Sequence, residues 1–125
     1  MALEIVTRRS GVITVLEVSG RITLGKEADH LRKSVIDAFE SGHQLMVVQL
    51  AGVQSADSAG VGELVSVYAS ITRRGGSIRF LQPSKKLRAM FHVTGLDDLL
   101  DIYDDEQQAL ASFGPHNSAK RALVE

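Results

Sequence analysis

The chain has 125 residues, of which 44% are hydrophobic and none is cysteine. This length fits one domain, and the lack of cysteine excludes disulfide bonds and thiolate metal sites. Fourteen basic and fifteen acidic residues give a net charge of −1, so no overall field attracts nucleic acid or an anionic membrane. No apolar run reaches the roughly 20 residues that span a bilayer. We therefore expect a cytoplasmic protein without direct contact with nucleic acid or membrane.

The first forty residues predict a β-hairpin followed by a helix. Extended patterns cover residues 3–9 and 12–19, and Gly11 between them accepts the positive φ of a tight turn. Gly20 is expected to end the second strand. Residues 26–41 carry apolar side chains at helical spacing, which predicts an amphipathic helix packed on a sheet.

The rest of the chain alternates between strands and helices. Residues 45–50 are almost continuously apolar, which is typical of a central strand covered on both faces. Residues 51–56 are interpreted as a polar connection. The later elements are predicted in this order: a helix over 58–74, a strand around Ile78 and Phe80, a helix capped by Ser84 and closed by Gly95, an edge strand within 99–103, and a helix after Asp104.

This order of elements predicts an α/β fold with a mixed, mostly parallel sheet that opens with a hairpin. Strands that alternate with helices pair in parallel through right-handed crossovers, and about four helices are expected mainly on one side of the sheet. Residues 1–113 would form the domain. Residues 114–125 lack periodicity and are expected to be a flexible C-terminal tail.

One segment between the central strand and the second helix carries a functional signal. It reads Asp57-Ser58-Ala59-Gly60-Val61-Gly62. Ser58 falls at a helix N-terminus, where free N–H groups and the macrodipole favour a phosphate. Asp57 could cap the helix or orient the Ser58 hydroxyl, and the glycines would leave the outer surface open to a partner's backbone. Local chemistry alone favours the simpler interpretation, an ordinary N-cap followed by glycines that serve packing.

The segment and its surroundings resemble the signature of STAS domains, named for sulfate transporters and anti-sigma-factor antagonists. The strand before it, the run Arg73-Arg74-Gly75-Gly76 after the helix, and the order of elements over about residues 3–113 all agree with that family. The resemblance implies a non-enzymatic phosphoprotein that regulates transcription by partner switching. Ser58 would be phosphorylated by a GHKL-type serine kinase that doubles as the anti-sigma factor.

The resemblance also implies how such a switch works. The unphosphorylated antagonist sequesters the anti-sigma factor and frees a sigma factor, whereas the phosphorylated form does not bind, and a metal-dependent serine phosphatase restores it. The chain departs from many family members at Ala59, where a second hydroxyl is common, and at Thr23, where many antagonists carry an acidic residue. The loop that holds Thr23 should lie beside Ser58. Thr23 is interpreted as the N-cap of the first helix, with modification as the alternative.

Helical spacing extends the candidate surface along the second helix. The residues expected to point away from the core are Ala59, Glu63, Ser66, Val67 and Ser70, with Val67 as an apolar residue on the outer face. The predicted partner-binding surface consists of Thr23, Asp57, Ser58, Ala59, Gly60, Gly62, Glu63, Ser66 and Val67.

Other function classes stay open or are disfavoured. A STAS scaffold or an accessory subunit of a signalling assembly or transporter, without phosphoswitching, is the main alternative, and a small-ligand or nucleotide-binding module is a further one. Ala56 stands where a hydrolase elbow needs glycine. No motif calls for a cofactor or a metal, because the third glycine of a dinucleotide fingerprint is absent and the four histidines show no ligand spacing. Self-association is undecided by the sequence.

Charge is segregated along the chain although its sum is small. Residues 73–88 contain basic side chains without an acid, and residues 97–106 contain acidic side chains without a base. Solvated surface explains most such runs, and a polar partner surface is the alternative.

Overall fold

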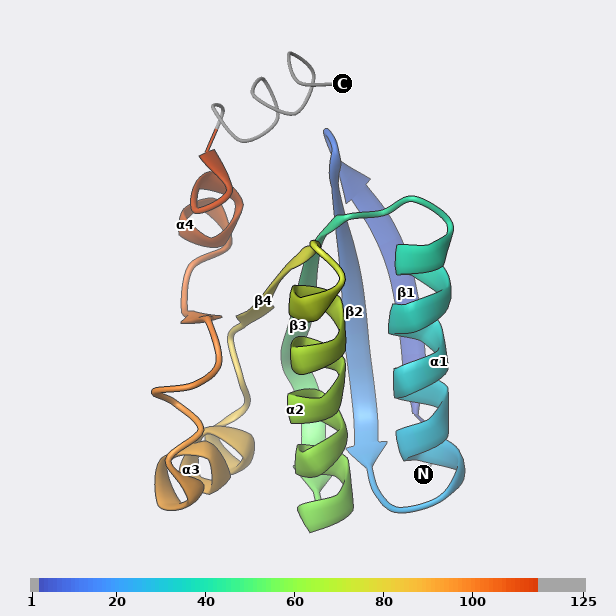
Figure 1. Cartoon of the computed structure of the whole chain (residues 1–125). Helices are drawn as coiled ribbons and strands as arrows, with labels where there is room; N and C mark the ends of the chain where they lie inside the picture. Colours follow the sequence, from blue (N-terminus) through green and yellow to red (C-terminus); the bar gives the residue numbers. More distant parts are fainter. Residues whose placement is uncertain (1–2, 115–125) are drawn as a thin grey trace.

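The computed structural model of the chain describes residues 3–114, which form one sheet with helices on both of its faces (Figure 1). Within these residues the strands are β1 (Glu4–Ser10), β2 (Ile13–Ile22), β3 (Leu45–Ala56), β4 (Ser77–Leu81) and β5 (Ile102–Tyr103). The helices are α1 (Lys26–Glu40), α2 (Ser58–Arg73), α3 (Lys85–Thr94) and α4 (Glu106–Ala111).

The sheet has the strand order β1-β2-β3-β4-β5. β1 and β2 are antiparallel and form the opening hairpin, with Gly11 at φ 62° in its turn. All later neighbours pair in parallel, because a helix connects each strand to the next. The predicted fold class, a mixed and mostly parallel sheet that opens with a hairpin, is confirmed.

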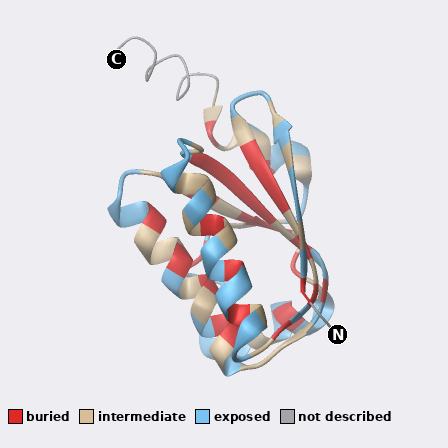
Figure 2. Cartoon of the chain, turned by 90° about the vertical axis from the view of Figure 1, so that its right-hand side faces the viewer, coloured by how far each residue is buried: buried red, intermediate tan, exposed pale blue. Residues whose placement is uncertain are grey.

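Two clusters of buried side chains hold the helices on the sheet. The larger one packs α1, α2 and α3 on one face, through residues such as Leu31, Leu64 and Phe91. The smaller one packs Ala109 and Phe113, at and just after α4, on the opposite face. Figure 2 shows the buried positions on the middle strands and on the helix sides turned towards them. The helices therefore lie mainly on one side, as predicted.

Two predicted boundaries are wrong, and both errors have one cause. β2 does not end at Gly20, which takes φ 104° and lies at an irregularity after which the strand continues to Ile22. Residues 51–56 are not a connection but the second half of β3, which pairs with this extension of β2. Val53 is 1% exposed, since it packs in the core. The two strands therefore run together to the start of α2.

The C-terminal elements follow their local signals. Ser84 caps α3 by accepting a hydrogen bond from the Leu87 N–H at 3.4 Å, and Gly95 ends that helix in the left-handed conformation. Of the predicted tail, residues 115–125 lie outside the described residues. Across residues 3–114 no helix is both long enough and apolar enough to cross a membrane.

Candidate functional site

Asp57 organises the end of the sheet where β2 and β3 stop and α2 starts. Its N–H donates to the Ile22 carbonyl at 3.2 Å. Its carboxylate accepts two backbone hydrogen bonds, from Gly60 at 2.8 Å and from Leu24 at 3.0 Å. These hydrogen bonds lower the pKa of Asp57, because they stabilise the ionised carboxylate. The bond from Leu24 has the larger effect and the bond from Gly60 the next largest. Of the two roles expected for Asp57, the helix cap is confirmed, and both carboxylate oxygens are bonded to backbone amides.

Ser58 is the first residue of α2 and is exposed. Its hydroxyl has no hydrogen-bond partner within residues 3–114. The first N–H groups of a helix have no partner inside the helix, and they give its N-terminus a partial positive charge. Ser58 therefore presents a free hydroxyl at a position that favours a negative group.

The two glycines of the segment have opposite environments. A Cβ at Gly60 would lie 1.9 Å from the Ile22 carbonyl oxygen, so only glycine lets α2 approach the end of β2 this closely. Gly60 is buried and is not open to a partner, which corrects the prediction for this residue. Gly62 is exposed, and a Cβ there would meet nothing within 4 Å. Gly62 alone of the two can belong to an outer surface.

The loop before α1 lies beside the start of α2, as predicted. The bond from Leu24 to Asp57 joins them. The interpretation of Thr23 as N-cap is wrong, because Gly25 takes the cap position at φ 100° and no side chain caps the helix. The Thr23 hydroxyl instead donates to Glu27 at 3.3 Å. Thr23 is half-buried, so the loop still contributes surface next to the site.

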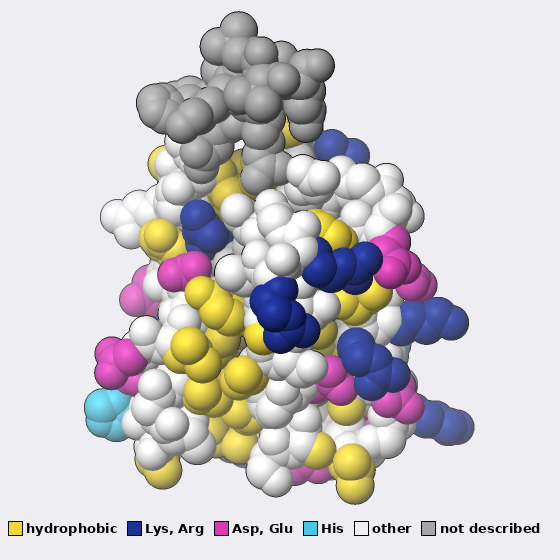
Figure 3. Space-filling model, viewed as in Figure 1, with side chains coloured by type: hydrophobic (Ala, Val, Ile, Leu, Met, Phe, Trp, Pro, Cys, Tyr) yellow, Lys and Arg dark blue, Asp and Glu magenta, His cyan; other side chains and the backbone are white. Residues whose placement is uncertain are grey.

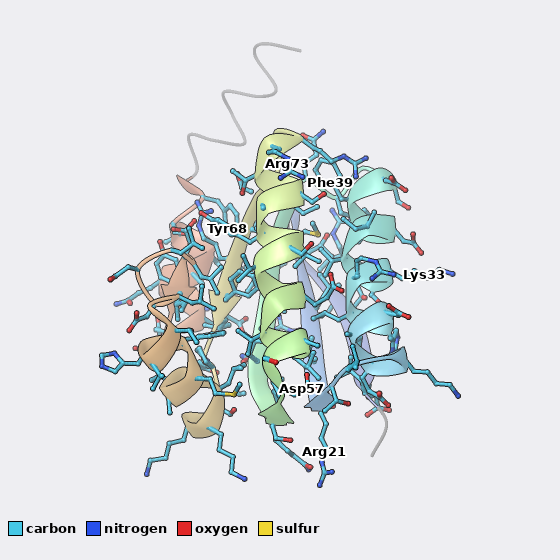
Figure 4. All side chains as sticks on the ribbon, turned by 60° about the horizontal axis from the view of Figure 1, so that its bottom comes forward. Arg21, Lys33, Phe39, Asp57, Tyr68 and Arg73 are labelled. Atoms are coloured by element: carbon cyan, nitrogen blue, oxygen red, sulfur yellow. The ribbon has the colours of Figure 1, made fainter. Side chains whose placement is uncertain are left out.

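Two exposed residues of this end were missed by the sequence reasoning. Leu24 is 75% exposed and is held by its bond to Asp57. Arg21 is exposed, and Figure 4 shows it at the same end of the molecule as Asp57. Both residues belong to the stretch of residues 20–25 that was expected beside Ser58, but the sequence singled out only Thr23 in it.

The outer face of α2 is narrower than predicted. Val67 is 1% exposed, because α1 packs along α2 and covers that side, so the prediction of an outward Val67 is wrong. Glu63 forms an ion pair with Arg32 of α1 at 3.2 Å, and its side chain is only 14% exposed. Ser66 is exposed and Ala59 is half-exposed. The accessible part of the predicted surface is therefore centred on Ser58 and Gly62.

A shallow groove runs between α1 and α2 beyond this site. It has a volume of about 420 Å³, and Ile36 and Val67 are among its lining residues. Basic and acidic side chains alternate around it, including Arg32, Asp37 and Arg74. Such mixed charge fits no single class of charged small ligand.

Residues 3–114 contain no group of three or more His, Asp or Glu side chains placed to hold a metal ion. His43 bonds the buried Thr14 hydroxyl at 2.7 Å, and His92 lies 3.0 Å from Asp97. Both histidines therefore have structural partners.

The segregated charges of the sequence meet in the fold. Arg79 lies 3.6 Å from Asp101 and stacks on the Phe113 ring at 4.5 Å, and Arg88 pairs with Asp104. These two pairs join the basic run to the acidic run, so part of the segregated charge is matched within the domain.

The STAS domain family model matches residues 4–109. The chain belongs to the STAS domain family. It is 33% identical over 89 residues to a Thermotoga maritima protein provisionally named an anti-sigma factor antagonist, covering 70% of this chain and 79% of that one. It is 31% identical over 87 residues to the anti-sigma-B factor antagonist of Bacillus subtilis, covering 70% of this chain and 78% of that one. These similarities place this STAS protein in the anti-sigma factor antagonist family.

Solved structures agree with this STAS fold. An anti-sigma factor antagonist from Bacillus superposes in its unphosphorylated form with a TM-score of 0.70 and 18% identity, covering 87% of this chain and 95% of that one. Its phosphorylated form gives a TM-score of 0.66, also at 18% identity, covering 87% and 98%. At this identity the likeness shows the fold.

An apolar strip lies beside α2 on the STAS domain. Figure 3 shows hydrophobic side chains gathered between α2 and α3. Tyr68, Met90 and Ile102 are partly buried against the larger core cluster. The Tyr68 hydroxyl bonds Asp101 at 3.4 Å. Burial, aided by the charge of Asp101, raises the pKa of Tyr68, so this ring stays neutral at physiological pH.

Proposed function

We propose that this STAS protein is an anti-sigma factor antagonist whose binding is switched by phosphorylation of Ser58. The observation that carries the proposal is the placement of Ser58, whose hydroxyl is exposed and has no partner in the described part of the chain. The backbone around Ser58 is held by the Asp57 cap before it and by the close contact of Gly60 with Ile22 after it. The names of the relatives, and the Bacillus neighbour solved in both phosphorylation states, support the same reading.

Phosphorylation would change the charge of the site without unfolding it. A phosphoserine carries about −1.5 to −2 charges, so the net charge of −1 would become about −3. The positive end of the α2 dipole favours that charge in the free protein. A partner that covers Ser58 must desolvate or repel the phosphate. If this costs about 3–4 kcal/mol, the affinity falls a few hundredfold.

The partner that fits this role is a GHKL-type serine kinase that is also the anti-sigma factor. It binds the Ser58 end of α2 together with the Thr23 loop and then modifies the hydroxyl, and a metal-dependent phosphatase reverses the reaction. In this role the chain supplies the substrate hydroxyl and the kinase supplies the catalytic groups, so the chain acts as a binding protein. An anti-sigma factor binds its sigma factor in the cytoplasm, which is where we expect the protein.

Binding to the cognate kinase tests the proposal. We expect Ser58→Ala to bind like the wild type, whereas Ser58→Asp and the Ser58-phosphorylated protein lose most of the affinity. Thr72→Asp is the matched control, because it adds the same charge to an exposed position of the same helix, fourteen residues later. Equal affinity for Ser58→Ala, Ser58→Asp and the wild type would overturn the switch.

Mass spectrometry separates the switch from its alternative. Incubation with ATP and each candidate kinase, followed by peptide mapping, should place one phosphate on Ser58 and none on Thr23. If no kinase phosphorylates Ser58, a STAS scaffold or accessory subunit without switching becomes the better description.

A further inference from the structure

β1 forms a free edge of the sheet. It pairs with β2 on one side, and within residues 3–114 no strand pairs with its other side. Figures 1 and 2 show it at the margin of the sheet, largely exposed. Its seven residues span roughly 24 Å at the usual rise per residue. An edge of this length presents a row of unpaired backbone groups that another strand can join.

The hairpin fixes which backbone groups point outward. In a hairpin with a two-residue turn, the residues that flank the turn form a hydrogen-bonded pair, here Ser10 and Ile13. The even-numbered residues of β1 therefore bond to β2. The N–H and C=O groups of Ile5, Thr7 and Arg9 point to the free edge.

The side chains of β1 point alternately to the two faces of the sheet. Glu4, Val6 and Arg8 share the face of β1 on the α4 side, since Arg8 bonds Glu106 of α4 at 2.7 Å. Val6 is 53% exposed, and Glu4 is exposed without an ion-pair partner in the described residues. Arg8 bonds Glu17 through Nε and Glu106 through Nη2. Its Nη1 takes no part in these bonds.

We propose that β1 pairs in antiparallel fashion with β1 of a second copy of this chain, about a two-fold axis that passes through Val6. In this register Val6 lies opposite Val6 of the second copy. Glu4 lies opposite Arg8 of the second copy, and the converse pair forms on the other side of the axis. Opposite charges that face each other across an antiparallel pair attract and help to set the register.

The charges of this edge match a second copy of β1 in one particular register. Outward groups must face outward groups, so the two nearest alternative two-fold registers are centred on Ile5 and on Thr7. The first places Glu4 opposite Val6. The second places Val6 opposite Arg8 and Glu4 opposite Ser10, so each of them removes both charge pairs. An edge that only discourages pairing carries charges that repel a second copy, whereas here a negative and a positive residue stand at equal distances from Val6. No β1 residue belongs to the Ser58 site, so the pairing is independent of the proposed switch.

Cysteine cross-linking tests the pairing and its register. The chain has no cysteine, so each single variant reports one position. Residues opposite each other in a non-hydrogen-bonded pair have Cα atoms about 4.5 Å apart, which lies within the range that a disulfide spans. Val6→Cys should therefore oxidise to a dimer of twice the 13.5 kDa chain. Val93→Cys, on the 83% exposed Val93 of α3, is the control for random collision.

Two outcomes of the cross-linking contradict the proposal. If the Val6→Cys variant cross-links no faster than the Val93→Cys variant, the pairing is overturned. If the Thr7→Cys variant cross-links faster than the Val6→Cys variant, the register centred on Val6 is overturned.

Sedimentation of the unmodified protein supplies a second measurement. The wild type should pass from monomer to dimer as its concentration rises, and Glu4→Arg should weaken the dimer at least about tenfold, because it places two arginines opposite each other. Val12→Lys is the control, since Val12 is 55% exposed but lies in the hairpin turn outside β1. A wild-type protein that stays monomeric up to about 0.5 mM, where a dimer of micromolar affinity would be almost fully formed, overturns the proposal.

Discussion

The carboxylate of Asp57 accepts a hydrogen bond from the backbone N–H of Leu24, 33 residues earlier in the chain, at 3.0 Å. The other oxygen of the same carboxylate caps α2 through Gly60 at 2.8 Å. One side chain therefore holds both the loop before α1 and the first turn of α2. The surface on either side of Ser58 depends on it.

Removal of this carboxylate should destabilise the fold more than removal of another helix cap. Asp57→Ala loses two hydrogen bonds, whereas Ser84→Ala loses one, of 3.4 Å. We expect thermal unfolding followed by circular dichroism to show a larger drop in midpoint for Asp57→Ala. An equal or smaller drop than for Ser84→Ala would mean that the bond to Leu24 does not contribute.

The same carboxylate should leave a signature in the pH dependence of stability. The pKa of Asp57 lies below its ordinary value of 3.8 in the folded protein. A group whose pKa is lowered by folding stabilises the protein above its unfolded pKa, and this stability is lost as the pH falls through the folded pKa. The advantage of the wild type over Asp57→Asn in urea unfolding should be constant above about pH 5 and shrink below about pH 4. An advantage that is unchanged at pH 3 would contradict the lowered pKa.

Gly60 and Gly62 should respond to alanine in opposite directions. Gly60→Ala forces a Cβ against the Ile22 carbonyl and should destabilise the protein by about 1–3 kcal/mol or more. Gly62→Ala meets nothing within 4 Å and should stabilise the helix by about 0.5–1 kcal/mol. Chemical denaturation measures both variants under one set of conditions. A loss of similar size for both would show that helix propensity, and not the contact with Ile22, decides the cost.

Val67 should behave as a core residue. Val67→Ala removes a side chain that is 1% exposed, and we expect a loss of about 1.5–3 kcal/mol in the free energy of unfolding. Ser66→Ala, at the exposed neighbouring position, should stay within about 0.5 kcal/mol of the wild type. In kinase binding, the folded Val67→Ala variant should match the wild type. A selective loss of binding would instead place Val67 at the interface.

Features encoded by neighbouring residues were predicted well. The caps at Asp57 and Ser84 and the stop at Gly95 each depend on a side chain or a φ angle within a few residues. The alternation of strands and helices likewise fixed the fold class, because a parallel pair needs a helical crossover.

Features that depend on distant residues were not visible in the sequence. β3 continues past residue 50 only because β2 continues past Gly20 and supplies a partner. Val67 is buried because α1 lies along α2, which the periodicity of one helix cannot reveal. Gly60 is required by the Ile22 carbonyl, 38 residues earlier in the chain. In each case tertiary contact overrode a local pattern.

The close approach of Gly60 to Ile22 divides the Asp-Ser-Ala-Gly segment into parts with different origins. The aspartate and the buried glycine are demanded by the architecture, since one ties the loop and the other admits the helix. The serine between them has no such structural role, because its side chain is exposed and makes no hydrogen bond within the described residues. A chain that kept Asp57 and Gly60 but replaced Ser58 would still fold in the same way. In this chain the aspartate and the glycine therefore serve the shape of the domain, whereas the side chain at position 58 is left free for the switch that we propose.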